Sequence, residues 1–236
     1  MGYFLVKKKD IEGDRVVIKG KEFRHIKNVL RARIDDKIVV ITGDGEEYHS
    51  FISEIKSNYI VAHIAKITRR THEPGIYAAI AIAPPKARRM EWFVEKATEI
   101  GVSEIIPVVT MRSVVIPGSA KVIRWKRIAV SSVKQSERSI LPKIREVVSF
   151  EELLFLSQEF PFRFIAYEKE RKRAFEEYLD GKGVKKVLTL IGPEGGFEDW
   201  EVKVAVERGF SPVKLGEAKL RTETAGIVAL TRILAM

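Results

Sequence analysis

From residue 76 onward the sequence alternates apolar strands with amphipathic helices, and this pattern restricts the fold more than any other feature. The run 76–83 is apolar without interruption, as expected for a strand buried on both faces of a sheet. Strands are predicted at 76–83, 104–109, 163–167, 187–191 and 213–215, and helices at 87–100, 122–136, 198–207 and from about 223. Strands separated by helices of this length form a mostly parallel sheet with helices on both faces. We therefore expect an α/β domain over residues 73–236.

The preceding residues have a different pattern. Short runs rich in β-branched residues at 15–19, 37–42, 48–55 and 59–67 are separated by turns such as Gly43-Asp44-Gly45. Such runs predict a small β-barrel or sandwich over residues 1–72. One helix, expected at 22–31, carries apolar residues on one side and basic residues elsewhere. The polar segment 68–74, which ends in Pro74, marks the expected domain boundary.

Composition excludes several classes of chemistry. The chain has no cysteine, so a disulfide framework, a thiol nucleophile and a cysteine zinc site are excluded. All four histidines precede residue 73, which excludes a Ser-His-Asp triad or a histidine zinc site within the α/β domain, and we expect no metal. The absence of a leader or membrane-spanning run predicts a cytoplasmic protein. Only two Asn and two Gln among 236 residues suggest a thermophilic source.

The segment Gly192-Pro193-Glu194-Gly195-Gly196 follows the apolar strand 187–191 and precedes a helix. Its glycines let the backbone approach a ligand at the carboxyl end of a strand, where open α/β sheets bind ligands. It lacks the Gly-Lys-Ser/Thr of a P-loop and the spacing of a dinucleotide fingerprint. A ligand loop is favoured over a merely tight connection, because three glycines are more than such a turn needs. A second short segment that contains glycine, 215–225, joins the strand 213–215 to the last helix.

Positive charge is concentrated in one segment. The formal net charge of the chain is +10, and residues 112–145 contain nine Lys and Arg against one acid, Glu137, a net of +8. Basic runs that serve only to solvate a surface normally mix both signs. The segment therefore favours binding to a nucleic acid.

Six ordered blocks together resemble one family, the bacterial 16S rRNA uridine-N3 methyltransferases (RsmE-type) of the SPOUT superfamily. The blocks are Phe23-Arg24-His25-Ile26 with Val29-Leu30-Arg31; Lys86 with Glu91-Trp92 and 96–101; Arg112-Ser113-Val114; Gln135-Ser136 with Arg138; 192–197; and 220–225. The resemblance covers nearly the whole chain. Three departures are Ala218-Lys219, where the family usually has Arg-Ile, Glu137, where it often has Gly, and Lys134, where an acidic residue is expected.

The resemblance implies an N-terminal PUA-like β-barrel that holds RNA, and a C-terminal SPOUT α/β domain tied in a trefoil knot. It also implies S-adenosyl-L-methionine as cofactor, a homodimer with its active sites at the subunit interface, and 16S rRNA in the assembled small ribosomal subunit as substrate. The implied cofactor-binding residues are Leu190, Ile191, Gly192, Glu194, Gly195, Gly196, Leu215, Gly216, Leu220 and Thr224.

Methylation at uridine N3 requires loss of the N3 proton, and the α/β domain has no histidine to accept it. We expect Arg138 to stabilise charge on a uracil carbonyl with help from the Gln135 amide, while Glu194 either accepts the proton or orders its loop. The residues expected to contact RNA are Arg24, His25, Arg31, Arg33, Lys86, Arg112, Arg124 and Arg127. His25 could equally be an ordinary surface histidine.

Three other functions are compatible with parts of the pattern. A non-catalytic RNA-binding or ribosome-assembly protein would use the barrel alone and bind no cofactor. A SPOUT methyltransferase could act on another RNA or on ribose, although the block from Gln135 to Arg138 argues against it by resemblance. A small-molecule methyltransferase would leave the charge of residues 112–145 unexplained.

Overall fold

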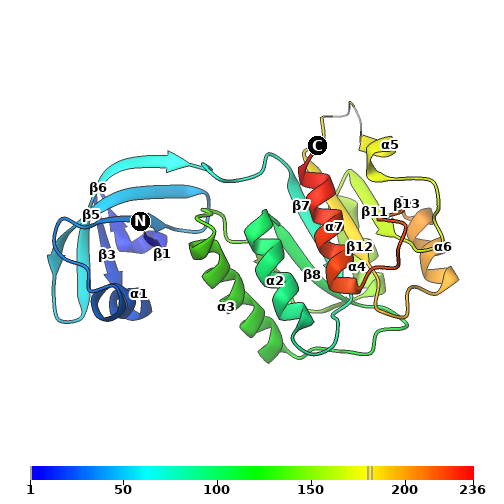
Figure 1. The fold of residues 1–236 in the computed structure, drawn as a ribbon, viewed down its shortest axis with the longest axis horizontal. Coiled ribbons are helices and arrows are strands. Elements are labelled where there is room, and N and C mark those ends of the chain that lie inside the picture. The colour runs from blue at the N-terminus through cyan, green and yellow to red at the C-terminus, as the bar shows by residue number, and fades with distance from the viewer. Residues whose placement is uncertain (1, 180, 182) are drawn as a thin grey trace. The chain divides into compact units, whose positions relative to one another are not determined.

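The computed structural model describes residues 2–179, 181 and 183–236, and the chain divides into two compact units (Figure 1). The first unit runs to Glu73 and also includes Val133–Leu141, and the second comprises Pro74–Ser132 and the chain from Pro142 onward. The segment Val133–Leu141, which the sequence analysis places in the second domain, thus packs within the first unit. Its buried Val133 side chain joins a cluster with Tyr3, Val39 and Ile41.

The first unit is built on one six-stranded sheet. Its strands are β1 (Gly2–Leu5), β2 (Ile11–Glu12), β3 (Arg15–Lys19), β4 (Lys37–Ile41), β5 (Glu46–Ile55) and β6 (Tyr59–Arg69). The order is β1-β4-β5-β6-β3-β2, in which β1 and β4 are parallel and the other neighbours are antiparallel. The four strands expected from β-branched runs are confirmed. The short strands β1 and β2 were not predicted, because a strand of two to four residues has too little alternation to detect.

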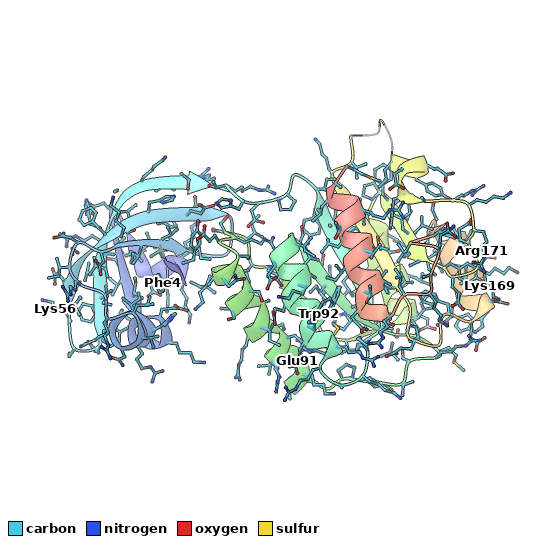
Figure 2. The ribbon with its side chains drawn as sticks, in the orientation of Figure 1. Phe4, Lys56, Glu91, Trp92, Lys169 and Arg171 are labelled. Atoms are coloured by element: carbon cyan, nitrogen blue, oxygen red, sulfur yellow. The ribbon has the colours of Figure 1, made fainter. Side chains whose placement is uncertain are left out.

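The core of the first unit contains Phe4, Ile18 and Ile60, each at most 1% exposed, and Figure 2 shows Phe4 inside this unit. The expected helix 22–31 differs in the structure. A short helix α1 (Gly20–Arg24) continues into a π-helical turn at His25–Val29, where the Leu30 N–H bonds to the His25 carbonyl five residues back. The wider π-helical turn leaves Leu30 exposed. The apolar face that the sequence predicts for the helix 22–31 is therefore only partly buried. A 3₁₀ turn at Lys8–Asp10 completes the unit.

The second unit contains a seven-stranded sheet in which every pair is parallel. Its strands are β7 (Tyr77–Ile82), β8 (Glu104–Val109), β9 (Lys143–Ile144), β10 (Val148–Ser149), β11 (Phe162–Ala166), β12 (Lys186–Ile191) and β13 (Ser211–Val213). The order is β10-β8-β7-β12-β11-β13, with β9 also paired to β8. The prediction of a parallel α/β sheet is confirmed.

Helices cover both faces of this sheet (Figure 1). The helices that follow β7 in the chain are α2 (Arg89–Ile100), α3 (Ser119–Gln135), α4 (Phe150–Leu156), α5 (Phe175–Leu179), α6 (Asp199–Glu207) and α7 (Thr222–Leu234), with a 3₁₀ turn at Ser157–Glu159. Helices α4 and α6 pack on the face that carries Ala79 and Ala81, and α7 packs on β7, β12 and α2. Helices α4 and α5 were not predicted, because five to seven residues give no clear helical period. In the described part of the chain, no helix combines the length and apolar character that a membrane crossing needs.

Strand β12 lies between β7 and β11, and β13 follows β11 at the edge of the sheet. Because β11, β12 and β13 are parallel neighbours, the loops that follow them all begin at the carboxyl ends of these strands, on the same side of the sheet. This arrangement places three chain segments around one space at the carboxyl ends of the strands.

Candidate active site

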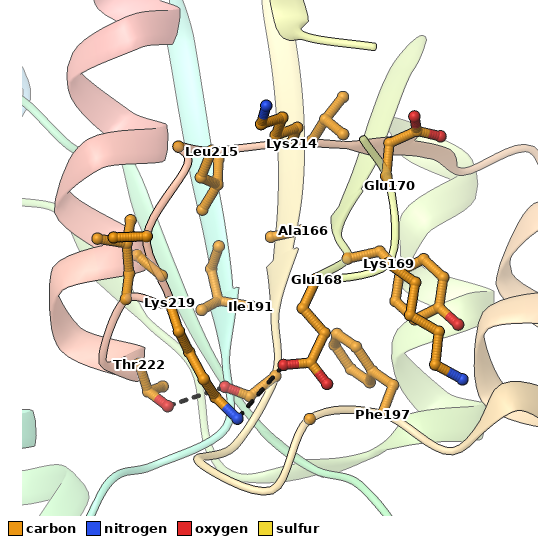
Figure 3. A pocket seen from close by; sticks show the side chains of 18 of the residues that line it. Ala166, Glu168, Lys169, Glu170, Ile191, Phe197, Lys214, Leu215, Lys219 and Thr222 are labelled. Atoms are coloured by element: carbon orange, nitrogen blue, oxygen red, sulfur yellow. Dashed lines mark hydrogen bonds and ion pairs between the residues drawn. The ribbon is translucent and has the colours of Figure 1, made fainter. Parts of the chain in front are cut away.

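A cavity of about 420 Å³ lies at the carboxyl ends of β11, β12 and β13 (Figure 3). Three loops line it, 167–171 after β11, 192–197 after β12 and 214–220 after β13, with Thr222 and Ala225 of α7. All of these residues belong to the second unit. The two loops singled out by their glycines are therefore brought together, and the third loop was missed by the sequence analysis.

The loop after β12 is held at both of its ends. The Thr222 hydroxyl donates to the Gly192 carbonyl at 3.0 Å, which ties the loop to the start of α7. The Arg112 guanidinium donates to the Gly195 carbonyl through Nη1 and to Glu198 Oε1 through Nε, both at 2.8 Å. The hydrogen bond to Glu198 raises the pKa of Arg112, so this clamp stays charged. The loop is therefore held by contacts within the protein itself.

Two glycines in this loop cannot be replaced without displacing a neighbour. Gly196 has φ +71°, and a Cβ atom there would lie 3.2 Å from Oε1 of Glu168. A Cβ on Gly192 would lie 2.9 Å from the Phe197 ring. Gly216, in the loop after β13, lines the cavity and has no other atom within 4 Å of a built Cβ, so its Cα faces open space. The backbone at Gly216 is thus open to the cavity.

An ion pair joins the walls of the cavity. Lys219 Nζ in the loop after β13 lies 3.4 Å from Oε2 of Glu168 in the loop after β11, as the dashed line in Figure 3 shows. Ile191, Phe197 and Leu215 add apolar side chains to the same lining, and all three are drawn in Figure 3. The cavity therefore offers apolar side chains together with one charge of each sign, which suits a ligand with an aromatic ring and charged groups.

A second charged cluster lies beside the cavity. Arg89, the first residue of α2, donates from Nη1 to Oε1 of the cavity-lining Glu194 at 3.4 Å, and its Nε lies 3.8 Å from Oε1 of Glu223. Glu223 is 7% exposed, and its other carboxylate oxygen has no hydrogen-bond partner in the described part of the chain. The Arg89 side chain is 42% exposed, so part of its guanidinium remains open to solvent.

The structure brings seven of the expected cofactor-binding residues to the cavity wall, namely Ile191, Gly192, Glu194, Gly196, Leu215, Gly216 and Leu220. Leu190 is fully buried in the sheet and does not line the cavity. Gly195 also lies off the wall, since its carbonyl accepts from Arg112 and a Cβ there would point at that side chain. Thr224 lies in the first turn of α7, outside the lining.

Of the three expected catalytic residues, Glu194 lies at the cavity, whereas Gln135 and Arg138 belong to the first unit. The Arg138 side chain is 3% exposed and forms a buried ion pair with Glu73 at 2.7 Å. Its guanidinium must leave Glu73 before it can contact a substrate.

The expected RNA-contacting residues are distributed over both units. Arg24, Arg31 and Arg33 are exposed in the first unit, and the ring of half-buried His25 packs edge-on against Phe4 with a centroid distance of 6.0 Å. In the second unit, Lys86 is exposed after β7, and Arg112 is committed to the loop after β12. The remaining two lie on α3, where Arg124 pairs with Glu91 at 2.8 Å and Arg127 is exposed.

Sequence reasoning missed two residues of the site, Glu168 and Arg89. Glu168 belongs to a run of alternating charges, 168–172, that looks like an ordinary solvated loop. Its position directly after a strand parallel to 187–191 was the available signal, because parallel neighbours end at the same edge. Arg89 approaches Glu194 over a separation of 105 residues, and no local pattern indicates that pairing.

Comparison with known proteins gives matches along nearly the whole chain. Residues 72–234 match the family model of an RNA methyltransferase domain, and residues 18–65 match that of an RNA methyltransferase PUA domain. The chain is 33% identical over 239 residues to the ribosomal RNA small subunit methyltransferase E of Bacillus subtilis, a match covering 97% of this chain and 93% of the relative.

Solved structures with the same fold contain a ligand. The ribosomal RNA small subunit methyltransferase E of Neisseria gonorrhoeae, bound to S-adenosyl methionine, has a TM-score of 0.88 and 25% identity, and the match covers 100% of this chain and 97% of that one. A protein of Legionella pneumophila in complex with the same cofactor has a TM-score of 0.86 and 27% identity, covering 99% of this chain and 96% of that one.

Proposed function

The chain belongs to the RNA methyltransferase family whose catalytic domain is joined to a PUA domain, and we propose that it methylates N3 of one uridine in small-subunit ribosomal RNA. Its cofactor is S-adenosylmethionine, and its substrate is the assembled small ribosomal subunit. The observation that carries the proposal is the cavity at the ends of β11, β12 and β13, which is walled by glycine-containing loops.

The residues of the cavity fit S-adenosylmethionine. The apolar side chains of Ile191, Phe197 and Leu215 suit the adenine ring, and the loops 192–197 and 214–220 offer backbone groups. Glu168 and Lys219 supply one charge of each sign, and they would pair with the oppositely charged groups of the cofactor's amino acid portion. When bound, the cofactor supplies an electrophilic methyl group on a sulfonium.

The protein's own part in the reaction is to hold the base and to handle one proton. Glu194 accepts the proton that leaves uridine N3, since this residue lines the cavity. Arg138, assisted by Gln135, stabilises negative charge on one uracil carbonyl after its release from Glu73. Because N3 lies on the pairing edge of the base, the uridine must be unpaired or flipped out of a helix.

Basic residues in both units hold the surrounding RNA. Exposed Arg24, Arg31 and Arg33 in the first unit and Lys86 and Arg127 in the second contact phosphates. The PUA match over residues 18–65 supports an RNA-binding role for the first unit.

The enzyme acts as a homodimer. Support comes from large apolar side chains left exposed on α2, α3 and the loop between β8 and α3: Trp92 is 45%, Ile123 is 50% and Ile116 is 74% exposed. The ion pair between Glu91 and Arg124 joins α2 to α3 beside two of these residues, and Figure 2 labels Glu91 and Trp92 on α2. A Trp92→Glu variant that sediments as a dimer, like the parent protein, would count against this interface.

The C-terminal segment passes through a loop as a trefoil knot. The position of β12 between β7 and β11, and the hydrogen bond from Thr222 to Gly192, support this threading. Pulling the chain by its ends tests it, because a knotted chain stops short of the full extension of about 3.3–3.6 Å per residue.

The cofactor site is tested with S-adenosylhomocysteine, the demethylated product, by calorimetry. We compare the parent protein with Gly216→Trp, which should fill the cavity, and with Gly75→Trp, an exposed glycine that also has no atom within 4 Å of a built Cβ. Binding lost only in Gly216→Trp supports the proposal. Binding retained in Gly216→Trp would place the cofactor elsewhere, and absence of binding in all three proteins would remove the enzymatic function.

The substrate is tested by mass spectrometry of nucleosides from small subunits and from naked 16S rRNA after reaction. N3-methyluridine at one position, formed faster on subunits, is the expected result. A different methylated nucleoside would refute the uridine-N3 assignment.

A further inference from the structure

Arg89 and Glu194 form a donor–acceptor pair at the edge of the cavity. The pair is joined by a single hydrogen bond of 3.4 Å between Nη1 and Oε1. Both side chains remain partly accessible, at 42% for Arg89 and 34% for Glu194. In the described part of the chain, Nη2 of Arg89 makes no hydrogen bond, so this pair retains donors on the arginine and a carboxylate oxygen on the glutamate.

A third residue, Glu223 of α7, holds the Arg89 side chain in place. Glu223 is 7% exposed and lies 3.8 Å from Arg89 Nε through its Oε1 atom. It stands in the first turn of α7, next to Thr222, which bonds the loop carrying Glu194. Because Glu223 is buried and charged groups are costly to leave unpaired, it holds the Arg89 guanidinium near the cavity. Glu223 is thus a positioning residue for the pair.

We propose that Arg89 and Glu194 read the pairing edge of the target base and select uracil over cytosine. This inference rests on the proposed uridine-N3 methylation. Uracil presents a carbonyl oxygen that accepts and an N3–H that donates, and the pair presents guanidinium N–H groups beside a carboxylate. Cytosine presents an amino donor in place of the carbonyl and an unprotonated N3 acceptor in place of N3–H. The guanidinium would then face a donor and the carboxylate would face an acceptor, so neither hydrogen bond could form.

The same contacts serve the chemistry. The N3–H proton passes to Glu194, the freed N3 electron pair forms the new bond to the methyl carbon, and the electrons of the broken carbon–sulfur bond remain on sulfur. Glu194 then releases the proton to water. Negative charge that develops during proton loss spreads over the two carbonyl oxygens that flank N3, and Arg89 stabilises it on the carbonyl that Arg138 does not contact.

Arg89 stands at the cavity without first giving up a buried partner, unlike Arg138. It belongs to the same unit as the cavity and bonds a residue of the cavity wall, whereas the guanidinium of Arg138 is buried against Glu73. Arg88 provides a matched control, because it is exposed, adjacent and equally charged, and no side-chain partner is found for it in the described part of the chain.

The experiment first maps the methylated uridine with the parent protein, and then uses small subunits carrying uridine or cytidine at that position. Arg89→Ala is expected to lower kcat by about 100-fold and to leave the affinity for S-adenosylhomocysteine within about twofold of that of the parent. Arg89→Lys is expected to recover part of the lost kcat. Arg88→Ala is expected to behave as the parent. Thermal unfolding of each variant verifies that it is folded.

Binding gives a readout that does not depend on turnover. With S-adenosylhomocysteine present, the parent protein is expected to bind the uridine subunits at least tenfold more tightly than the cytidine subunits. Glu194→Gln, whose amide can also donate, is expected to narrow that ratio to near one. An unchanged ratio in Glu194→Gln, or equal kcat values for Arg89→Ala and Arg88→Ala, would overturn the inference. If the parent protein forms no N3-methyluridine, the proposed function fails instead.

Discussion

Arg138 donates two hydrogen bonds to the same carboxylate oxygen of Glu73, from Nη2 at 2.7 Å and from Nε at 3.2 Å. The other oxygen accepts the backbone N–H groups of Ser139 and Ile140, both at 2.8 Å. Glu73 is the last residue of the first unit before the chain enters the second. The pair therefore fixes this point of the chain to the segment Val133–Leu141.

Replacement of Glu73 by Ala is expected to lower the free energy of unfolding by about 3–5 kcal/mol. The change leaves the Arg138 charge without its carboxylate and removes the acceptor of two backbone N–H groups. Urea unfolding followed by circular dichroism measures the effect, with Glu73→Gln as the milder comparison. A loss below about 1 kcal/mol would mean that the pair is not a structural tie. Any loss of activity in an Arg138 variant has to be judged against the same unfolding curve.

Gly226 on α7 is expected to resist replacement by alanine. A Cβ atom there would lie 2.5 Å from Cε2 of Phe93 on α2, so the two helices must separate. Alanine in a helix interior normally stabilises by about 1 kcal/mol relative to glycine, but overpacking of a core costs about 1–3 kcal/mol. We expect Gly226→Ala to destabilise the protein and Phe93→Leu to relieve part of the effect in the double variant. A stabilised Gly226→Ala protein would show that α2 and α7 are not in contact as described.

The parallel sheet and the loop 192–196 could be predicted because their signals are local. The apolar run 76–83 is a strand by its own composition, and the glycines of the loop stand directly after another such run. The helix 87–100 likewise ends where expected, with Gly101 at φ +123° after α2. Local periodicity and backbone restrictions act over a few residues, so a single sequence displays them.

The charged contacts of the site could not be predicted, because they join residues far apart in the sequence. Glu73 and Arg138 are separated by 65 residues, and Arg89 and Glu194 by 105. The presence of a single Glu or Arg in the sequence does not indicate which distant residue it will pair with. The segment Val133–Leu141 was assigned to the second domain for the same reason, since only its packing against Tyr3, Val39 and Ile41 shows where it belongs.

The first unit is expected to lose stability between about pH 10 and pH 12 through Tyr3. Burial, followed by the negative charges of Glu47 and Glu137, raises the pKa of Tyr3 from 10.0 to about 12. The folded state then holds this proton where the unfolded chain releases it, so stability is full below pH 10 and falls as pH rises toward 12. Chemical unfolding of the parent protein and Tyr3→Phe across this range measures the difference. Parallel curves for the two proteins would contradict the shift.

The ion pair between Lys219 and Glu168 is expected to affect ligand binding rather than folding. Its side chains are 70% and 50% exposed, and exposed pairs contribute little to stability. Because it joins two walls of the cavity, Lys219→Ala should weaken S-adenosylhomocysteine binding severalfold while the unfolding curve is unchanged. Lys203→Ala, a lysine on α6 that does not line the cavity, serves as control. Equal affinities of the two variants would show that the pair has no part in the site.

The basic residues of α3 differ in whether an acidic side chain already pairs with them. Lys126 and Arg124 are paired with Glu146 and Glu91 at 2.8 Å, whereas Lys121 and Arg127 are exposed and no ion-pair partner is found for them among the described residues. Each phosphate contact contributes about 0.7–0.9 to the slope of log K against log salt concentration.

Replacement of Lys121 or Arg127 by Ala is therefore expected to reduce the magnitude of this slope, measured with 16S rRNA, by about 0.7–0.9, which is the contribution of one phosphate contact. Replacement of Lys126 should change it less, because the loss of its charge also frees Glu146. Filter binding over a range of KCl concentrations measures the slopes, and similar slopes for the paired and unpaired residues would mean that α3 does not lie against the RNA.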